Sequence, residues 1–121
     1  MGLKDTFKTH YETSDREMDV DLQTRYYKNN YQQCKEAVVQ TLKKASYTVR
    51  FEDDARQELM LNTKGVELIV SMVRISPIET AVDFTVNTQG LISFGKGKKV
   101  IASVYKELDQ VLTLKGIALK R

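Results

Sequence analysis

Residues 66–76 have the sequence VELIVSMVRIS, and apolar side chains occupy both of its alternating sets of positions. One set consists of Val66, Leu68, Val70 and Met72, and the other of Ile69, Val73 and Ile75. Successive side chains of a strand point to opposite faces of a sheet, so apolar residues on both faces are typical of a strand in the middle of a sheet. We therefore expect residues 66–76 to form a central strand, with other side chains covering part of its second face.

Alternating patterns on either side of this segment predict its neighbours in the sheet. Residues 57–63 and 79–88 each place apolar side chains on one face, and we expect these to point inward: Leu59, Leu61, Val82, Phe84 and Val86. Gly65 permits a tight hairpin turn before the central strand, and Pro77 ends that strand because it has no N–H for a ladder hydrogen bond. The three segments together predict an antiparallel meander.

Two further segments alternate in the same way. In residues 47–52, we expect Tyr47, Val49 and Phe51 to face one way, and the acidic pair that follows to make a turn. Residues 20–27 show a weaker alternation, which predicts a short strand before the first helix.

Amphipathic helices are predicted between residues 29 and 45 and between residues 100 and 115. Apolar residues recur there at steps of three and four, as on one face of a helix: Tyr31, Cys34, Ala37, Val38, Leu42 and Ala45 in the first, and Val100, Ile101, Val104, Tyr105, Leu108, Val111 and Leu112 in the second. Asn29 is the expected N-cap of the first helix, with Gln32 three positions on. Gly116 is the expected C-terminal stop of the second, with Ile117 packing back on its last turn.

The fold class that follows is α+β, in the order strand, helix, four strands, helix. The simplest packing is an antiparallel sheet of four to five strands with both helices on one face. Residues 20–121 are expected to form one domain, because 121 residues suit one hydrophobic core and are too few for two ordinary domains. Residues 1–19 are polar and are expected to form an N-terminal arm.

The cysteine content and hydropathy favour a cytoplasmic protein. Cys34 is the single cysteine, which cannot form an internal disulfide or a cysteine-based zinc site and fits a reducing compartment. The first residues lack the apolar run of a signal peptide, and no stretch approaches the roughly 20 apolar residues that span a bilayer. We therefore expect no transmembrane segment.

Two resemblances add to this interpretation. The order of elements is similar to one repeat of the TATA-binding-protein-like fold. The run from Thr24 to Lys28, the capped helix and the run from Tyr47 to Asp54 resemble a small uncharacterised cytosolic protein family of Gram-positive bacteria. That resemblance implies a bacterial, cytoplasmic setting and carries over no catalytic residue, and a fold-level likeness to a DNA-binding protein is a weak argument for function.

Residue types that usually carry catalysis are few in this chain, and we expect no catalytic, cofactor-binding or metal-binding residue. The only histidine, His10, lies in the arm, and Cys34 lies on the apolar stripe of the first helix, where a buried thiol is the simpler interpretation. The acidic run from Glu52 to Asp54 has no further ligand spaced to complete a cation site. Residues 90–97 spell seven positions of a phosphate-binding P-loop, but Gly97 replaces the hydroxyl residue of the eighth.

Basic residues suggest contact with an anion at the start of the second helix. Lys96, Lys98 and Lys99 lie where the helix dipole already presents positive charge, so an anion there would stabilise the arrangement. Residues 24–50 and 91–121 each carry a net charge of +5. The partner would be a phosphate, a nucleic-acid backbone or an anionic lipid, and the alternative is a solvated glycine-lysine loop.

The face of the sheet opposite the helices suggests a protein interface. If the helices cover the inward side chains, apolar residues remain on the other face: Met60, Ile69, Val73, Ile75 and Ala81. An exposed apolar strip usually marks an interaction site, although the arm or the C-terminal tail could cover it. We therefore expect a non-enzymatic binding domain that associates with itself or with a protein partner. Binding to an anionic surface is the second hypothesis, and a small enzyme without a cofactor is the third.

Overall fold

The computed structural model describes residues 10–14, 22–88 and 96–118. Within these ranges the helices are α2 (Tyr31–Lys44) and α3 (Lys96–Val111). The strands are β1 (His10–Glu12), β2 (Arg25–Tyr27), β3 (Thr48–Asp53), β4 (Glu58–Thr63), β5 (Val66–Ser76), β6 (Glu79–Thr88) and β7 (Leu114–Ile117).

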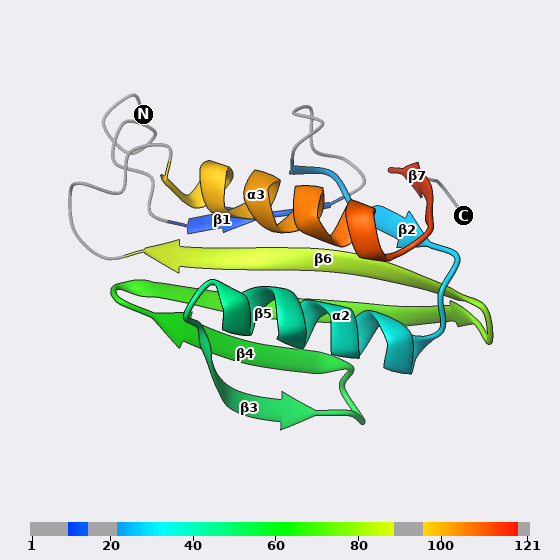
Figure 1. The fold of residues 1–121 in the computed structure, drawn as a ribbon, viewed down its shortest axis with the longest axis horizontal. Coiled ribbons are helices and arrows are strands. Elements are labelled where there is room, and N and C mark those ends of the chain that lie inside the picture. Colours follow the sequence, from blue (N-terminus) through cyan, green and yellow to red (C-terminus); the bar gives the residue numbers. More distant parts are fainter. Residues whose placement is uncertain (1–9, 15–21, 89–95, 119–121) are drawn as a thin grey trace.

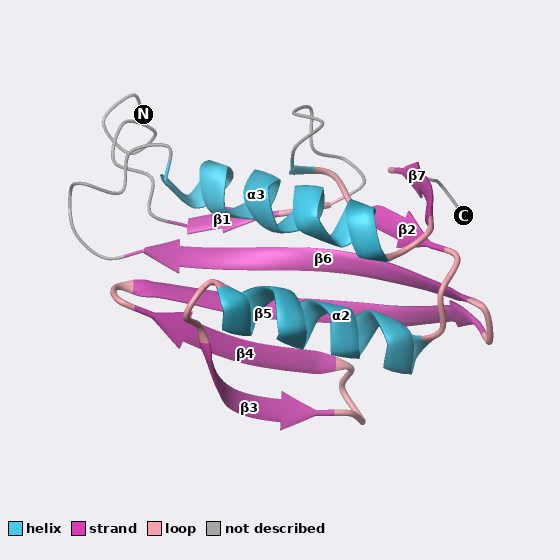
Figure 2. Ribbon diagram, viewed as in Figure 1, coloured by secondary structure: helices cyan, strands magenta, loops and turns pink. Residues whose placement is uncertain are grey.

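All seven of these strands belong to one antiparallel sheet in the order β3-β4-β5-β6-β2-β7, with β1 also paired to β6. Strands β1 and β2 lie one after the other along the same edge of β6, beside Asn87 and Val82 respectively. Figures 1 and 2 show α2 and α3 lying antiparallel to each other across one face of the sheet. We call this the inner face, and the opposite one the outer face.

The α+β class and the packing of two helices on one face are confirmed, and so is the central strand. Strand β5 lies between β4 and β6, and all of its predicted inward residues are buried. They form a continuous core with the inward residues of the neighbouring strands and with both helices: Leu59, Leu61, Leu68, Val70, Met72, Val82, Phe84 and Val86 from the sheet, and Val38, Leu42, Ile101, Tyr105 and Leu108 from the helices. The Tyr105 hydroxyl donates to the Val82 carbonyl at 2.8 Å, which satisfies a polar group inside this core.

The predicted order of elements omitted two strands. His10–Glu12, assigned to the polar arm, forms β1 against β6. Gly116 was wrongly expected to stop the last helix, because α3 ends at Val111 and Leu114–Ile117 turns back as β7. The physical reason is that β7 pairs with the free edge of β2, so backbone hydrogen bonds replace further turns of helix. The strand predicted over residues 20–27 is shorter, starting at Arg25, and residues 20 and 21 lie outside the described ranges.

The predicted facing of β3 holds at Val49 and fails at Phe51. The register shifts between these two residues, so Val49 pairs with the inward Leu61, whereas Phe51 pairs with the outward Met60. An extra residue in one strand reverses the faces of all that follow it. Phe51 is therefore 49% exposed on the outer face.

The N-cap of α2 lies one residue later than predicted. Asn30 accepts from the Gln33 backbone N–H at 2.8 Å, and the Gln33 side chain accepts from the Asn30 N–H at 3.0 Å. This is a capping box, which satisfies two N–H groups that the first turn leaves without partners. Asn29 instead accepts from the Thr113 N–H at 2.7 Å and so ties the start of α2 to the end of α3.

The β4–β5 turn requires a left-handed backbone conformation at Gly65, which a substitution can test. Gly65 has a φ of 68°, and a Cβ added there would meet nothing within 4 Å. Replacing it with alanine would therefore cost about 1 kcal/mol through backbone strain alone, and asparagine, which tolerates the left-handed region, would cost less. We expect Gly65→Ala to lower the free energy of unfolding in urea more than Gly65→Asn does. Equal effects of the two substitutions would contradict this assignment.

Candidate functional site

The outer face carries a row of apolar side chains across three strands. The register places Phe51 of β3 beside Met60 of β4, and Met60 beside Ile69 of β5. We call these three residues the Phe51 row. Met60 and Ile69 are half-buried and Phe51 is exposed, so the row offers apolar surface to solvent near the β3 edge.

A polar row separates these residues from a second apolar group. The next register positions along the face hold Asp53, Glu58, Ser71 and Asp83. Beyond them, at the end of β5 and the β5–β6 turn, lies a group that we call the apolar corner: Val73, Ile75 and Ile78. Val73 is 42% exposed and Ile78 is 74% exposed, while Ile75 is half-buried at an irregularity in the β5–β6 register. The predicted strip is therefore two patches.

Ala81 contributes almost no surface to either patch. It pairs with Val73 on one side and with Tyr26 of β2 on the other. Ala81 is only 5% exposed and Tyr26 only 3%, although neither belongs to the core beneath the helices. Apolar side chains of the outer face are thus buried around β2 and partly exposed around β3 to β5.

The predicted basic residues lie at one end of the helix layer. Helix α3 begins at Lys96, Lys98 is half-buried and Lys99 is exposed. Because the helices are antiparallel, the last turn of α2 lies at the same end, with Lys43 and Lys44 exposed (Figure 1). Two adjoining hollows between the helices share Ala45 and Ser103, with Lys44 lining one and Lys99 the other. Most of the P-loop-like run, residues 90–95, lies outside the described ranges.

The only cysteine has the surroundings of a core residue. Cys34 is fully buried, and burial raises the pKa of its thiol to about 11. A thiol with that pKa stays protonated at neutral pH and is a weak nucleophile. The structure therefore offers no activation of Cys34.

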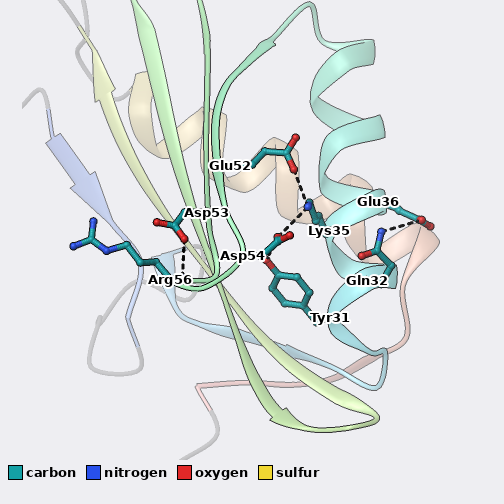
Figure 3. Close-up of polar contacts among 8 residues, drawn as sticks. All are labelled: Tyr31, Gln32, Lys35, Glu36, Glu52, Asp53, Asp54 and Arg56. Carbon is teal, nitrogen blue, oxygen red and sulfur yellow. Dashed lines mark hydrogen bonds and ion pairs between the residues drawn. The ribbon is translucent and has the colours of Figure 1, made fainter.

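The acidic turn after β3 already holds a cation, which is a lysine. Figure 3 shows Lys35 of α2 between two carboxylates, with its Nζ 2.7 Å from Glu52 Oε1 and 3.0 Å from Asp54 Oδ1. The Tyr31 hydroxyl donates to Asp54 at 3.0 Å, and the Arg74 guanidinium lies 4.0 Å from the centre of the Tyr31 ring. The bulge in β3 turns Glu52 to the helix side and so makes this cluster possible.

These contacts fix the charges of the cluster. Hydrogen bonds from Lys35 and Tyr31 lower the pKa of Asp54, and hydrogen bonds to Glu52 and Asp54 raise the pKa of Lys35. Within the described ranges, no group of three or more histidine, cysteine, aspartate or glutamate side chains could hold a metal ion. The arrangement ties α2 to β3.

A second polar cluster lies between β2 and α3, and no pattern in the sequence predicts it. Arg25 forms an ion pair with Asp109, the Tyr27 hydroxyl donates to Asp109 at 2.8 Å, and the guanidinium lies 4.5 Å from the centre of the Tyr105 ring. Arg25 and Tyr27 share one side of the β2 alternation, but Asp109 is 84 residues away from Arg25 along the chain. Burial and the Asp109 carboxylate raise the pKa of Tyr27, which therefore remains a donor.

Comparisons of the chain with protein-family models, with curated proteins and with solved structures found no match. The resemblances to a Gram-positive family and to the TATA-binding-protein-like fold therefore remain predictions. Among the helices of the described ranges, none is long and apolar enough to cross a bilayer.

The Lys35 cluster makes a prediction for pH dependence. Asp54 has a lower pKa in the folded protein than its ordinary value of 3.8, so its contribution to stability is present above that value and is lost as the pH falls through the folded pKa. We expect Asp54→Asn, which keeps an acceptor for Tyr31, to be less stable than wild type at pH 7. The difference should shrink in urea unfolding experiments carried out at progressively lower pH.

Repeating Asp54→Asn in a variant without Lys35 separates the effect of the lost negative charge from other effects of the substitution. In Lys35→Met the main cation beside Asp54 is gone, so Asp54→Asn should change the stability of that variant much less. A difference between Asp54→Asn and wild type that does not vary with pH would show that the ion pair contributes nothing.

Proposed function

We propose that this chain is a non-enzymatic cytoplasmic binding domain that associates with a second copy of itself, or with a protein partner, through the outer face of its sheet. The observation that carries the proposal is the exposure of two large apolar side chains on the face opposite the helices. Phe51 is 49% exposed and Val73 is 42% exposed. The single, buried cysteine fits the cytoplasmic setting.

The surroundings of these side chains support an interface rather than scattered surface apolar residues. Phe51 pairs with Met60, which pairs with Ile69, and Ile75 lies two residues beyond Val73 in β5. Each exposed residue therefore has further apolar residues near it in the sheet. Polar side chains border both patches, and apolar patches with polar rims are typical of protein interaction sites. Single exposed apolar residues would need no such explanation.

Charge complementarity favours a second copy as the partner. Arg50 lies beside the Phe51 row and donates to Asn62 at 3.0 Å, while Glu58 and Glu67 lie on the same face. Two copies related by a two-fold axis would bring each patch against its counterpart and let Arg50 of one copy approach a glutamate of the other. A partner whose surface carried charge of one sign could pair with Arg50 or with the two glutamates, but not with both.

Pairing through the edge of β3 is a less favourable route to the same dimer. The strand contains a bulge and the charged residues Arg50, Glu52 and Asp53, which are features that discourage one edge from adding to another. We therefore assign the association to the face of the sheet rather than to its edge.

Sedimentation equilibrium over a wide range of protein concentration tests this proposal. We expect the wild type to form dimers that dissociate on dilution, and Phe51→Lys or Val73→Lys to weaken the dimer at least about tenfold, because each places a charge in an apolar contact. Val111→Lys is the matched control, since Val111 is 65% exposed on α3. A wild type that stays monomeric throughout, or equal weakening by Val111→Lys, would overturn the proposal of self-association.

A second candidate function, binding to an anionic surface such as nucleic acid or anionic lipid, is favoured by the juxtaposition of Lys44 and Lys99 between the helix ends. Affinity of this kind falls as salt rises, with a slope set by the number of phosphate contacts. We expect Lys44→Gln and Lys99→Gln to reduce that slope by about one contact each in titrations with duplex DNA. Lys64→Gln, at the exposed β4–β5 turn, is the control, and unchanged slopes in all variants would exclude this function.

A further inference from the structure

A hollow of about 500 Å³ lies beside the buried arginine of β2, on the flank of α3. The residues that line it within the described ranges are Arg25, Ala102, Lys106, Asp109 and Gln110. We call it the Arg25 hollow. It belongs to the inner side of the sheet, so it is separate from the apolar patches of the outer face.

Arg25 lines this hollow although most of its side chain is buried. The residue is only 9% exposed, and its guanidinium lies over the Tyr105 ring. One nitrogen, Nη1, pairs with Asp109, but the buried Nε has no hydrogen-bond partner among the residues that the structure describes. A buried donor without an acceptor costs free energy, so an acceptor reaching this guanidinium would stabilise it.

The charge balance of the hollow favours an anion. Among the described residues, its lining contains two cations, Arg25 and Lys106, and one carboxylate, Asp109. That carboxylate is already occupied on both oxygens, by Arg25 Nη1 on Oδ2 and by the Tyr27 hydroxyl on Oδ1. Lys106 is exposed and lies about one helical turn from Asp109 on α3. The described part of the lining therefore has one more positive charge than negative charge.

The chemistry of the two cations indicates the class of ligand. The planar guanidinium of arginine suits the oxygens of phosphate and carboxylate groups, and a lysine ammonium adds a mobile point charge. We propose that the Arg25 hollow binds a small anion, a phosphate or carboxylate group held between Arg25 and Lys106. Asp109 is the negative charge that pairs with Arg25 in the same hollow.

The same cluster would exist if Arg25 only fastened β2 to α3, so the test must separate binding from stability. Lys106 serves this purpose because it is exposed and can be changed without disturbing the core. Asp109→Asn adds a second criterion: it keeps an acceptor for the Tyr27 hydroxyl and removes the negative charge. If the hollow binds an anion, that change removes a repelling charge and raises the affinity for the anion. If Arg25 only fastens β2 to α3, the change lowers stability and there is no anion binding to raise.

The experiment is a titration of the full chain with inorganic phosphate and, separately, with acetate, at constant ionic strength. Amide chemical shifts in NMR report the location and calorimetry reports the affinity. We expect saturable phosphate binding with shifts at Arg25, Lys106 and Gln110. Lys106→Gln should weaken it about fivefold and Asp109→Asn should tighten it, while Lys99→Gln should leave it unchanged. Stronger binding of phosphate than of acetate would identify a phosphate site, and the reverse a carboxylate site.

Two results would overturn the proposal. One is that neither anion produces saturable shifts at the hollow in the wild type. The other is binding that Lys99→Gln abolishes and Lys106→Gln does not, because the anion would then lie at the start of α3. If Asp109→Asn fails to fold, Lys106→Gln still decides between these outcomes.

Discussion

Packing of the inner face of β5 and β6 against α2 and α3 is the contact on which the other features depend. Leu68, Val70 and Met72 of β5 are fully buried there, and burying one such side chain contributes about 1.5–3 kcal/mol. Since side chains alternate along a strand, this burial also fixes the register, because a slip by one residue would turn the whole apolar set towards solvent. The outer positions of Ile69 and Val73 follow from the same alternation.

Polar clusters fasten each helix to a different part of the sheet. Lys35 joins α2 to the end of β3 through solvent-exposed carboxylates, an arrangement that contributes little to stability in most proteins. Arg25 joins β2 to α3 through a contact that is largely shielded from water, where loss of one partner would leave a buried charge. The two clusters therefore differ in kind. The first is an ion pair at the surface, and the second is an ion pair that is largely buried.

Local sequence patterns predicted the strands and helices that bury one face of their own side chains. They did not predict elements whose formation depends on contacts with distant parts of the chain. The periodicity of apolar residues predicts the meander and both helices. Every residue of β4 to β6 that was expected to point inward is buried. Strands β1 and β7 are too short for a pattern, and they form because β6 and β2 offer edges for backbone hydrogen bonds. The reversal at Phe51 depends on a bulge that alternation does not reveal.

The candidate sites show the same division. The sequence identified Met60, Ile69, Val73 and Ile75 as outward residues, because they occupy the second set of alternating positions. It missed Phe51, which the bulge adds to the patch, and it included Ala81, which β2 buries. The pairing of Arg25 with Asp109 joins opposite ends of the chain, and only the tertiary fold brings these residues together.

We propose that a second copy binds the outer face around β3 to β5. Amide and methyl NMR spectra recorded at increasing protein concentration test it most directly, because they locate the contact without any substitution. A dimer formed through this face should give concentration-dependent shifts at Phe51, Met60, Ile69 and Val73, with none along the exposed side of α2 and α3. Shifts confined to the helices, or spectra that do not change with concentration, would contradict it.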